Sequence, residues 1–206
     1  MNTQTTLQKE VPSFPKFRAK NYPQLVNLKG LSDKLLANHH KLYSAYVTNT
    51  NTFIEKMADL ETKGDRQSPL YAELKRRFAW EFDSVRLHEY YFENLGGQTN
   101  PDAAEHFKEK ITGQFGSFEK WRADFLGVGG MRGIGWVLLV QDDQTGRFLN
   151  VWIEQHHIGH LVDTHPVLIM DVFEHAYISD YGLEKTKYME AFFANANWEK
   201  ALERCR

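Results

Sequence analysis

Two long stretches of the chain carry apolar residues at the spacing of an amphipathic helix, and only a short break separates them. The first begins near residue 31, and the second covers residues 71–92 and ends before Gly96. Side chains three and four positions apart share one face of a helix, so each stretch presents a continuous apolar stripe. Because the break at residues 62–69 is short, the two helices should lie side by side. The sequence therefore predicts an antiparallel helical hairpin.

The pattern changes in the second half of the chain. Two shorter helical stretches are followed by three short apolar runs, at residues 136–140, 148–153 and 166–170. An Asp-Asp-Gln-Thr-Gly segment between the first two runs is typical of a hairpin turn. Helices resume after Asp171. We expect an α+β fold with a small three-stranded antiparallel sheet.

This pattern divides the chain into two predicted domains. Residues 1–97 would form an N-terminal arm and the antiparallel helical hairpin, and residues 98–206 would form an α/β domain. Residues 3–28 contain three prolines and no sustained period, so this arm should run extended over a surface.

Composition narrows the possible functions. The chain has 25 basic and 27 acidic residues, so no overall field would attract nucleic acid or a membrane surface. Cys205 is the only cysteine, which excludes a disulfide framework and a thiolate metal site. The first residues lack the apolar core of a secretory signal, and no stretch approaches a membrane span. We expect a cytoplasmic protein that acts on a small substrate or a protein partner.

Two histidines fall on the apolar faces of the predicted hairpin helices. His39 shares its face with Leu35 and Tyr46, and His88 shares its face with Val85. An isolated buried histidine is more often a core residue bonded to the backbone than a metal ligand. Two histidines facing each other across a hairpin could instead share one metal ion.

A third feature favours the metal. Asp171 ends the last apolar run, and His175 follows four residues later. Three neutral imidazoles and one carboxylate, with one solvent molecule, suit iron or manganese better than a catalytic zinc, which usually keeps three protein ligands. The nearby His156, His157 and His160 could be donors around the metal or solvated loop residues.

The segment Asp171-Val-Phe-Glu-His-Ala-Tyr177 resembles the signature of the iron/manganese superoxide dismutases. The likeness covers nearly everything after Leu31, and it includes the segments Tyr46-Val-Thr-Asn49, Phe115-Gly-Ser-Phe118, Gly133-Ile-Gly-Trp136 and Asn197-Trp-Glu199. The resemblance implies a superoxide dismutase for antioxidant defence, with one iron or manganese ion per subunit and iron slightly favoured.

The resemblance also implies roles for individual residues. The metal ligands would be His39, His88, Asp171 and His175, in a site between the two domains. Tyr46 would be a gateway tyrosine and Trp136 a wall of the pocket. Gln155, His156 or His157 would donate to solvent at the metal; His156 is favoured, and with Tyr46 it forms the predicted catalytic pair. Glu174 would reach the partner subunit's ligand histidine, in a homodimer or homotetramer.

The chain departs from the family pattern in the first helix. One residue fewer separates the histidine from Tyr46, which makes His40 an alternative to His39. Helical phase favours His39, because seven residues return nearly to the same face whereas six do not. Leu42 or Tyr43 stands where a histidine is common, and Ile178 replaces the tyrosine that usually pairs with it, as expected of a coordinated change.

Two other functions fit parts of the pattern. A non-catalytic metal-binding homologue would bind metal without turnover. A metallohydrolase with Glu174 as general base would need zinc and three ligands. For an anionic substrate, Lys41 and Arg86 are candidate guiding charges, although such a residue is more often part of a solvated surface.

Overall fold

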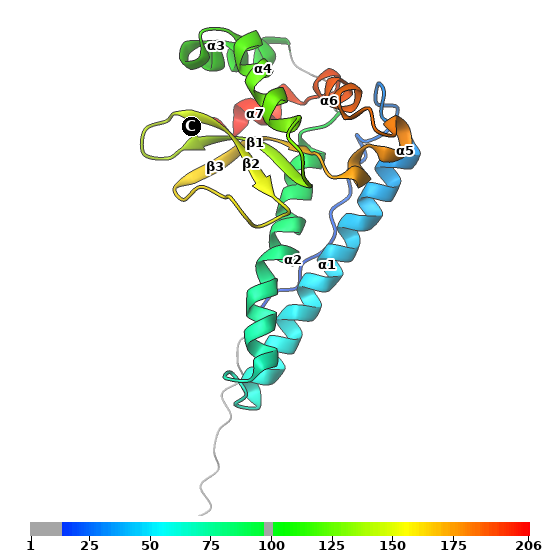
Figure 1. Cartoon of the computed structure of the whole chain (residues 1–206), viewed down its shortest axis with the longest axis vertical. Coiled ribbons are helices and arrows are strands. Elements are labelled where there is room, and N and C mark those ends of the chain that lie inside the picture. Colours follow the sequence, from blue (N-terminus) through cyan, green and yellow to red (C-terminus); the bar gives the residue numbers. More distant parts are fainter. Residues whose placement is uncertain (1–13, 97–100) are drawn as a thin grey trace, which may run out of the picture.

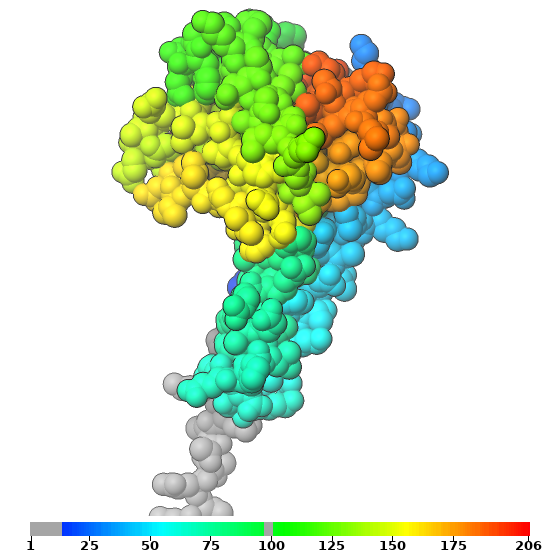
Figure 2. Space-filling view, in the orientation of Figure 1, coloured from blue at the N-terminus to red at the C-terminus, as the bar shows by residue number. Residues whose placement is uncertain are grey.

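The computed structural model describes residues 14–96 and 101–206. Two long antiparallel helices, α1 (Asp33–Thr62) and α2 (Pro69–Glu93), form the predicted hairpin. Ser32 and Ser68 cap their N-termini by accepting hydrogen bonds from backbone amides of the first turn. The far half of the hairpin projects from the rest of the molecule as a narrow stalk (Figures 1 and 2).

The described part of the N-terminal arm has no helix or strand before α1. The side chain of Asn51 fastens it to the hairpin, because it accepts from the amide of Phe17 and donates to the carbonyl of the same residue. The arm thus lies on the hairpin at Phe17, and a turn follows where the amide of Leu25 donates to the carbonyl of Tyr22 at 3.1 Å. The earlier residues of the arm lie outside the described part of the chain.

The second half of the chain has the predicted α+β organisation. Helices α3 (Pro101–Phe115) and α4 (Phe118–Gly129) precede a sheet of β1 (Gly135–Asp142), β2 (Phe148–Glu154) and β3 (Thr164–Asp171). The strand order is β2-β1-β3 and both pairings are antiparallel. A 3-10 helix, η1 (Glu174–Ala176), then leads into α5 (Ile178–Tyr181), α6 (Lys185–Ala194) and α7 (Trp198–Glu203) (Figure 1).

The buried face of α1 differs slightly from the predicted stripe. Tyr43 and Val47 are buried, whereas Leu42 and Tyr46 are half-buried. Tyr43 turns toward α2, where its hydroxyl donates to Glu89 at 3.1 Å. This rotation leaves Tyr46 at the edge of the core, where part of its ring reaches solvent.

Asn94, the residue that follows α2, joins the hairpin to the sheet. Its side-chain oxygen accepts from the amide of Ile169 in β3 at 3.0 Å and from Arg204 at 3.2 Å. Its carbonyl accepts from the amide of Asn197 at 2.8 Å. These bonds set the end of β3 against the last turns of α2, which places Asp171 beside His88.

Candidate metal centre

Four side chains from four elements converge at the junction of the hairpin and the sheet: His39 of α1, His88 of α2, Asp171 at the end of β3 and His175 of η1. One potential ligand atom from each residue lies within 4.8 Å of all the others. The side chains of the first three are fully buried, and that of His175 is 27% exposed. The structure therefore brings together all four residues predicted from the sequence.

One carboxylate oxygen, Asp171 Oδ2, is the centre of this cluster. The Nε2 atoms of His39 and His175 each lie 3.0 Å from it, and Nε2 of His88 lies 3.8 Å from it. Three imidazole nitrogens thus face one oxygen from three directions. Such convergence is the arrangement that a cation held between these atoms requires.

The hydrogen bond made by one ring nitrogen of His88 leaves its other nitrogen available to bind a metal. Its Nδ1 lies 2.6 Å from the backbone carbonyl of Ser84, which can only accept, so Nδ1 carries the hydrogen. In the neutral ring, Nε2 then presents a lone pair to the cluster, yet this buried atom has no hydrogen-bond partner. An unpaired buried acceptor is costly, and a metal ion would satisfy it.

The charge of the cluster also favours a cation. Burial lowers the pKa of His39 and sets that of His88 well below its usual value, so both rings are neutral near pH 7. Burial alone would raise the pKa of Asp171, but His175 and His39 beside it lower the pKa below the usual range. An ionised carboxylate beside the neutral imidazoles of His39 and His88 contributes ligands of the hardness that iron and manganese accept.

Asp171 is oriented by two further hydrogen bonds. The amide of Phe173 donates to its Oδ1 at 2.9 Å, and the hydroxyl of Tyr188 donates to its backbone carbonyl at 2.6 Å. With Oδ1 occupied, Oδ2 is left to face the histidines. Sequence reasoning missed Tyr188, because its contact with β3 depends on how α6 packs and leaves no local signal.

A second layer of polar groups lines the outer side of the cluster. Trp136 donates its indole hydrogen to Nδ1 of His156 at 3.1 Å, so the neutral His156 ring carries its hydrogen on Nε2. This Nε2 lies 3.2 Å from the hydroxyl of Tyr46 and donates to it. Burial lowers the pKa of His156 to about 3 and raises that of Tyr46 to about 12, so both stay neutral. The Tyr46 hydroxyl keeps its own hydrogen to donate elsewhere.

The structure separates the alternatives that the sequence left open. His40 points away from the cluster and its Nε2 lies 2.8 Å from the carbonyl of Lys20. His156 is fully buried beside Tyr46, whereas Gln155 and His157 are only half-buried. His160 contacts the backbone carbonyl of His156 at 2.9 Å and is outside the cluster.

Two candidate guiding charges differ in their surroundings. Arg86 forms an ion pair with Glu89 at 2.8 Å, and its guanidinium also lies over the ring of Phe17. Its charge is therefore committed to the contact between the arm and the hairpin. Lys41 is exposed on α1.

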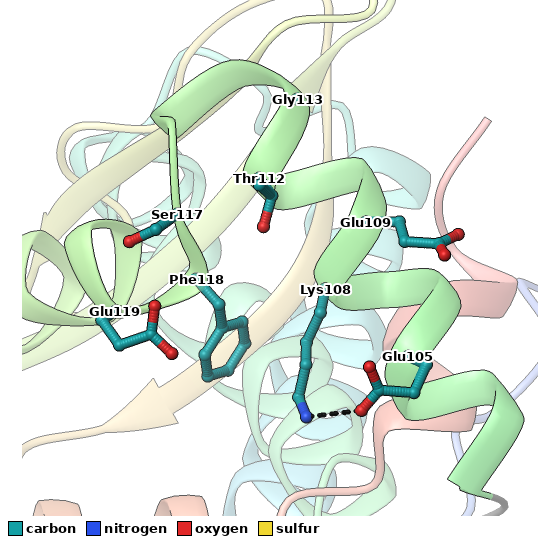
Figure 3. A pocket seen from close by; sticks show the side chains of 8 residues that line it. All are labelled: Glu105, Lys108, Glu109, Thr112, Gly113, Ser117, Phe118 and Glu119. Carbon is teal, nitrogen blue, oxygen red and sulfur yellow. Dashed lines mark hydrogen bonds and ion pairs between the residues drawn. The ribbon is translucent and has the colours of Figure 1, made fainter.

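A shallow surface depression lies elsewhere, between α3 and the start of α4 (Figure 3). Lys108 pairs with Glu105 at 2.7 Å at its edge, and Phe118 borders it. None of the four clustered residues lines this depression. In the described part of the chain, no helix is both long enough and apolar enough to cross a membrane.

Comparison with known proteins adds an independent observation. Residues 103–204 match the family model described as iron/manganese superoxide dismutases, C-terminal domain. The chain is 36% identical over 183 residues to a superoxide dismutase [Fe] of Cupriavidus metallidurans, which covers 86% of this chain and 89% of the relative. The chain belongs to the iron/manganese superoxide dismutase family.

Some of the other relatives are named for iron and some for manganese. A superoxide dismutase [Fe] of Aquifex pyrophilus is 32% identical over 92% of this chain and 91% of its own length. The superoxide dismutase [Mn] 2 of Haloferax volcanii is 30% identical over 84% of this chain and 86% of its own length.

The protein is therefore an oxidoreductase that converts superoxide to dioxygen and hydrogen peroxide with a bound iron or manganese ion. The metallohydrolase alternative loses its support, because its proposed base, Glu174, is exposed and lies outside the cluster.

Proposed function

We propose that His39, His88, Asp171 and His175 bind the single redox ion of each subunit. The observation that carries this proposal is the buried, unpartnered Nε2 of His88, which faces the same carboxylate oxygen as the other two imidazoles. When bound, iron or manganese takes one electron from a first superoxide and gives it to a second. We favour iron slightly, in line with the 36% identical relative, which is named as an iron enzyme.

Residues beside the proposed ion site can supply protons. Reduction of superoxide to hydrogen peroxide consumes two protons, so the site needs a donor at its mouth. Tyr46 is suited to this role because its hydroxyl is held protonated, half-buried and bonded to His156. His156 orients the hydroxyl through its Nε2 hydrogen, while Trp136 fixes the tautomer of His156. Oη of Tyr46 would give one of the two protons and be reprotonated from solvent, and solvent would supply the second.

A second copy of the chain would complete the surroundings of His175. Its ring is partly exposed, and the neighbouring Glu174 is exposed with the apolar Ile178 close by in sequence. We therefore propose a homodimer or homotetramer with Glu174 at the interface.

We also propose a cytoplasmic location and a division of the chain into two domains, residues 1–97 and 98–206. The boundary between these domains falls among residues 97–100, outside the described part of the chain.

The ligand set is tested by a matched pair of variants, His39→Gln and His40→Gln. His39→Gln should lose most of its iron or manganese and its superoxide turnover together, because one of four ligands is gone. His40→Gln should keep both, because the His40 ring lies outside the cluster and its Nε2 contacts the carbonyl of Lys20. Elemental analysis beside a superoxide assay measures each quantity. Normal metal content in His39→Gln, or zinc as the native metal, would contradict the proposal.

A further inference from the structure

One face of α2 runs from the surface to the metal centre. Arg77, Glu81, Ser84 and His88 follow one another at steps of four, three and four residues, which keeps them on one side of the helix. The last of them, His88, lies in the cluster, and the first, Arg77, is exposed to solvent. Tyr46 packs along this face, with its ring centre 5.5 Å from that of His88.

The guanidinium of Arg77 is held at this end of the face by stacking. It lies 3.9 Å from the ring centre of Trp80, which in turn packs edge to face on His156 with ring centres 4.8 Å apart. The cation is therefore two ring contacts away from the pair formed by Tyr46 and His156. Planar stacking on tryptophan restricts a guanidinium without neutralising its charge.

Arg77 differs from its neighbours in having no acidic partner. Among the described residues it forms no ion pair, whereas Arg76 pairs with Glu73 at 3.2 Å and Arg86 pairs with Glu89 at 2.8 Å. Its charge is thus available to act on an ion that approaches from solvent.

The same face of α2 also carries an acidic side chain. Glu81 is buried on the same face, and its Oε2 has no hydrogen-bond partner. Arg77 precedes Glu81 by four residues, so the two side chains bring opposite charges to the same side of the helix. Without Arg77, an approaching anion would meet the carboxylate of Glu81 with no arginine beside it.

We propose that Arg77, held by Trp80, guides superoxide toward the metal centre. Superoxide is a small univalent anion, and the field at a narrow entrance changes the rate at which such an ion arrives. Arg77 is not required to touch the reacting atoms. The inference rests on the proposed metal centre, since it assigns the direction from which substrate reaches it.

The test compares Arg77→Glu with Arg76→Glu in the metal-loaded protein. Both variants change the net charge equally, but only the first changes the field on the face that leads to His88. At low ionic strength, Arg77→Glu should lower kcat/KM about threefold to fivefold, because reversing one exposed charge weakens the attraction of an anion. The difference should shrink toward zero at about 0.5 M salt, where screening is strong. Arg77→Lys should keep most of the wild-type rate.

Azide gives a second readout that does not depend on turnover. Titrated into the metal-loaded protein and followed by absorbance, this univalent anion should bind about threefold more weakly to Arg77→Glu than to Arg76→Glu at low salt. Equal effects of the two variants, or a loss in Arg77→Glu that salt does not reduce, would overturn the inference. A wild-type protein without superoxide turnover would instead count against the assigned activity, and the azide comparison would still decide the role of Arg77.

Discussion

At the scale of single residues, the site depends on which nitrogen of each ring carries a hydrogen. The carbonyl of Ser84 fixes His88, and the indole of Trp136 fixes His156. Each fixed tautomer leaves one atom available for chemistry: a lone pair on His88 and a donor hydrogen on His156. The same residue types with other partners would offer the opposite atoms.

Tyr46→Phe should retain metal and lose turnover. The phenyl ring keeps the contact with His88, but the hydroxyl that we propose as proton donor and that bonds His156 is removed. We expect about a tenfold or larger fall in the proton-consuming half-reaction. Tyr71→Phe is the control, since its hydroxyl bonds Glu61 at the hairpin end at 2.6 Å. Stopped-flow decay of superoxide measures both, and an unchanged Tyr46→Phe rate would remove this hydroxyl from the mechanism.

Metal-free protein should lose stability in acid partly through His156. Its pKa is about 3 in the fold, because burial disfavours the charged ring, against 6.5 as the ordinary value. The unfolded chain therefore binds the extra proton first, and the penalty grows as pH falls through the window from 6.5 to 3. From pH 7 to pH 5 this amounts to about 2 kcal/mol.

The measurement is urea unfolding of metal-free wild type and His156→Gln at both pH values. The variant should lose about 2 kcal/mol less than wild type between pH 7 and pH 5. Identical pH dependence in the two proteins would show that His156 does not contribute in this way.

At the scale of elements, the close pairing of β1 with β2 sets the wall of the site. Gly135 begins β1, directly before Trp136. The backbone of β2 lies so close to it that a Cβ added to Gly135 would be 2.1 Å from the carbonyl oxygen of Ile153. The carbonyl of Gly135 accepts a hydrogen bond at 3.0 Å from the amide of Val172, the residue after Asp171. One glycine thus permits the approach of strands on which both His156 and Asp171 depend.

Gly135→Ala should destabilise the protein by about 3 kcal/mol and reduce metal retention, because the clash is with backbone. Gly113→Ala is the matched control. A Cβ at this position in α3 meets nothing within 4 Å, so the change should stabilise the helix by about 0.5 to 1 kcal/mol. Denaturant unfolding compares the two. Equal stability of the two variants would refute the argument from strand spacing.

At the scale of the whole molecule, the cluster lies where α1 and α2 meet β3 and η1, and one of its four residues remains near the surface. His175 is the one clustered residue with an exposed part. Ile178, in the helix that follows, exposes 48% of its surface. An ion pair or apolar contact from a second copy at this point would shield a ligand directly.

Ile178→Lys should therefore shift the protein toward the monomer, because a charge would be buried in the proposed interface. Val162→Lys, at a position that is 91% exposed in the turn between β2 and β3, is the control and should leave the mass unchanged. Light scattering across a range of concentrations measures both. A dimer of unaltered affinity in Ile178→Lys would exclude this face as the interface.

The sequence alone determined the helical hairpin, the three-stranded sheet and the candidate ligands. Helical and strand periods are local, and so is the spacing from Asp171 to His175 at a strand end. Only the tertiary structure showed that His39 and not His40 joins the cluster and that His156 is the buried neighbour of Tyr46, and only it revealed Tyr188 and Arg77 near the site. The reason is that these assignments depend on contacts between distant elements: His39 meets Asp171 across 132 positions of the chain. A local pattern places a side chain on a face, but the packing of one element on another decides what that face meets.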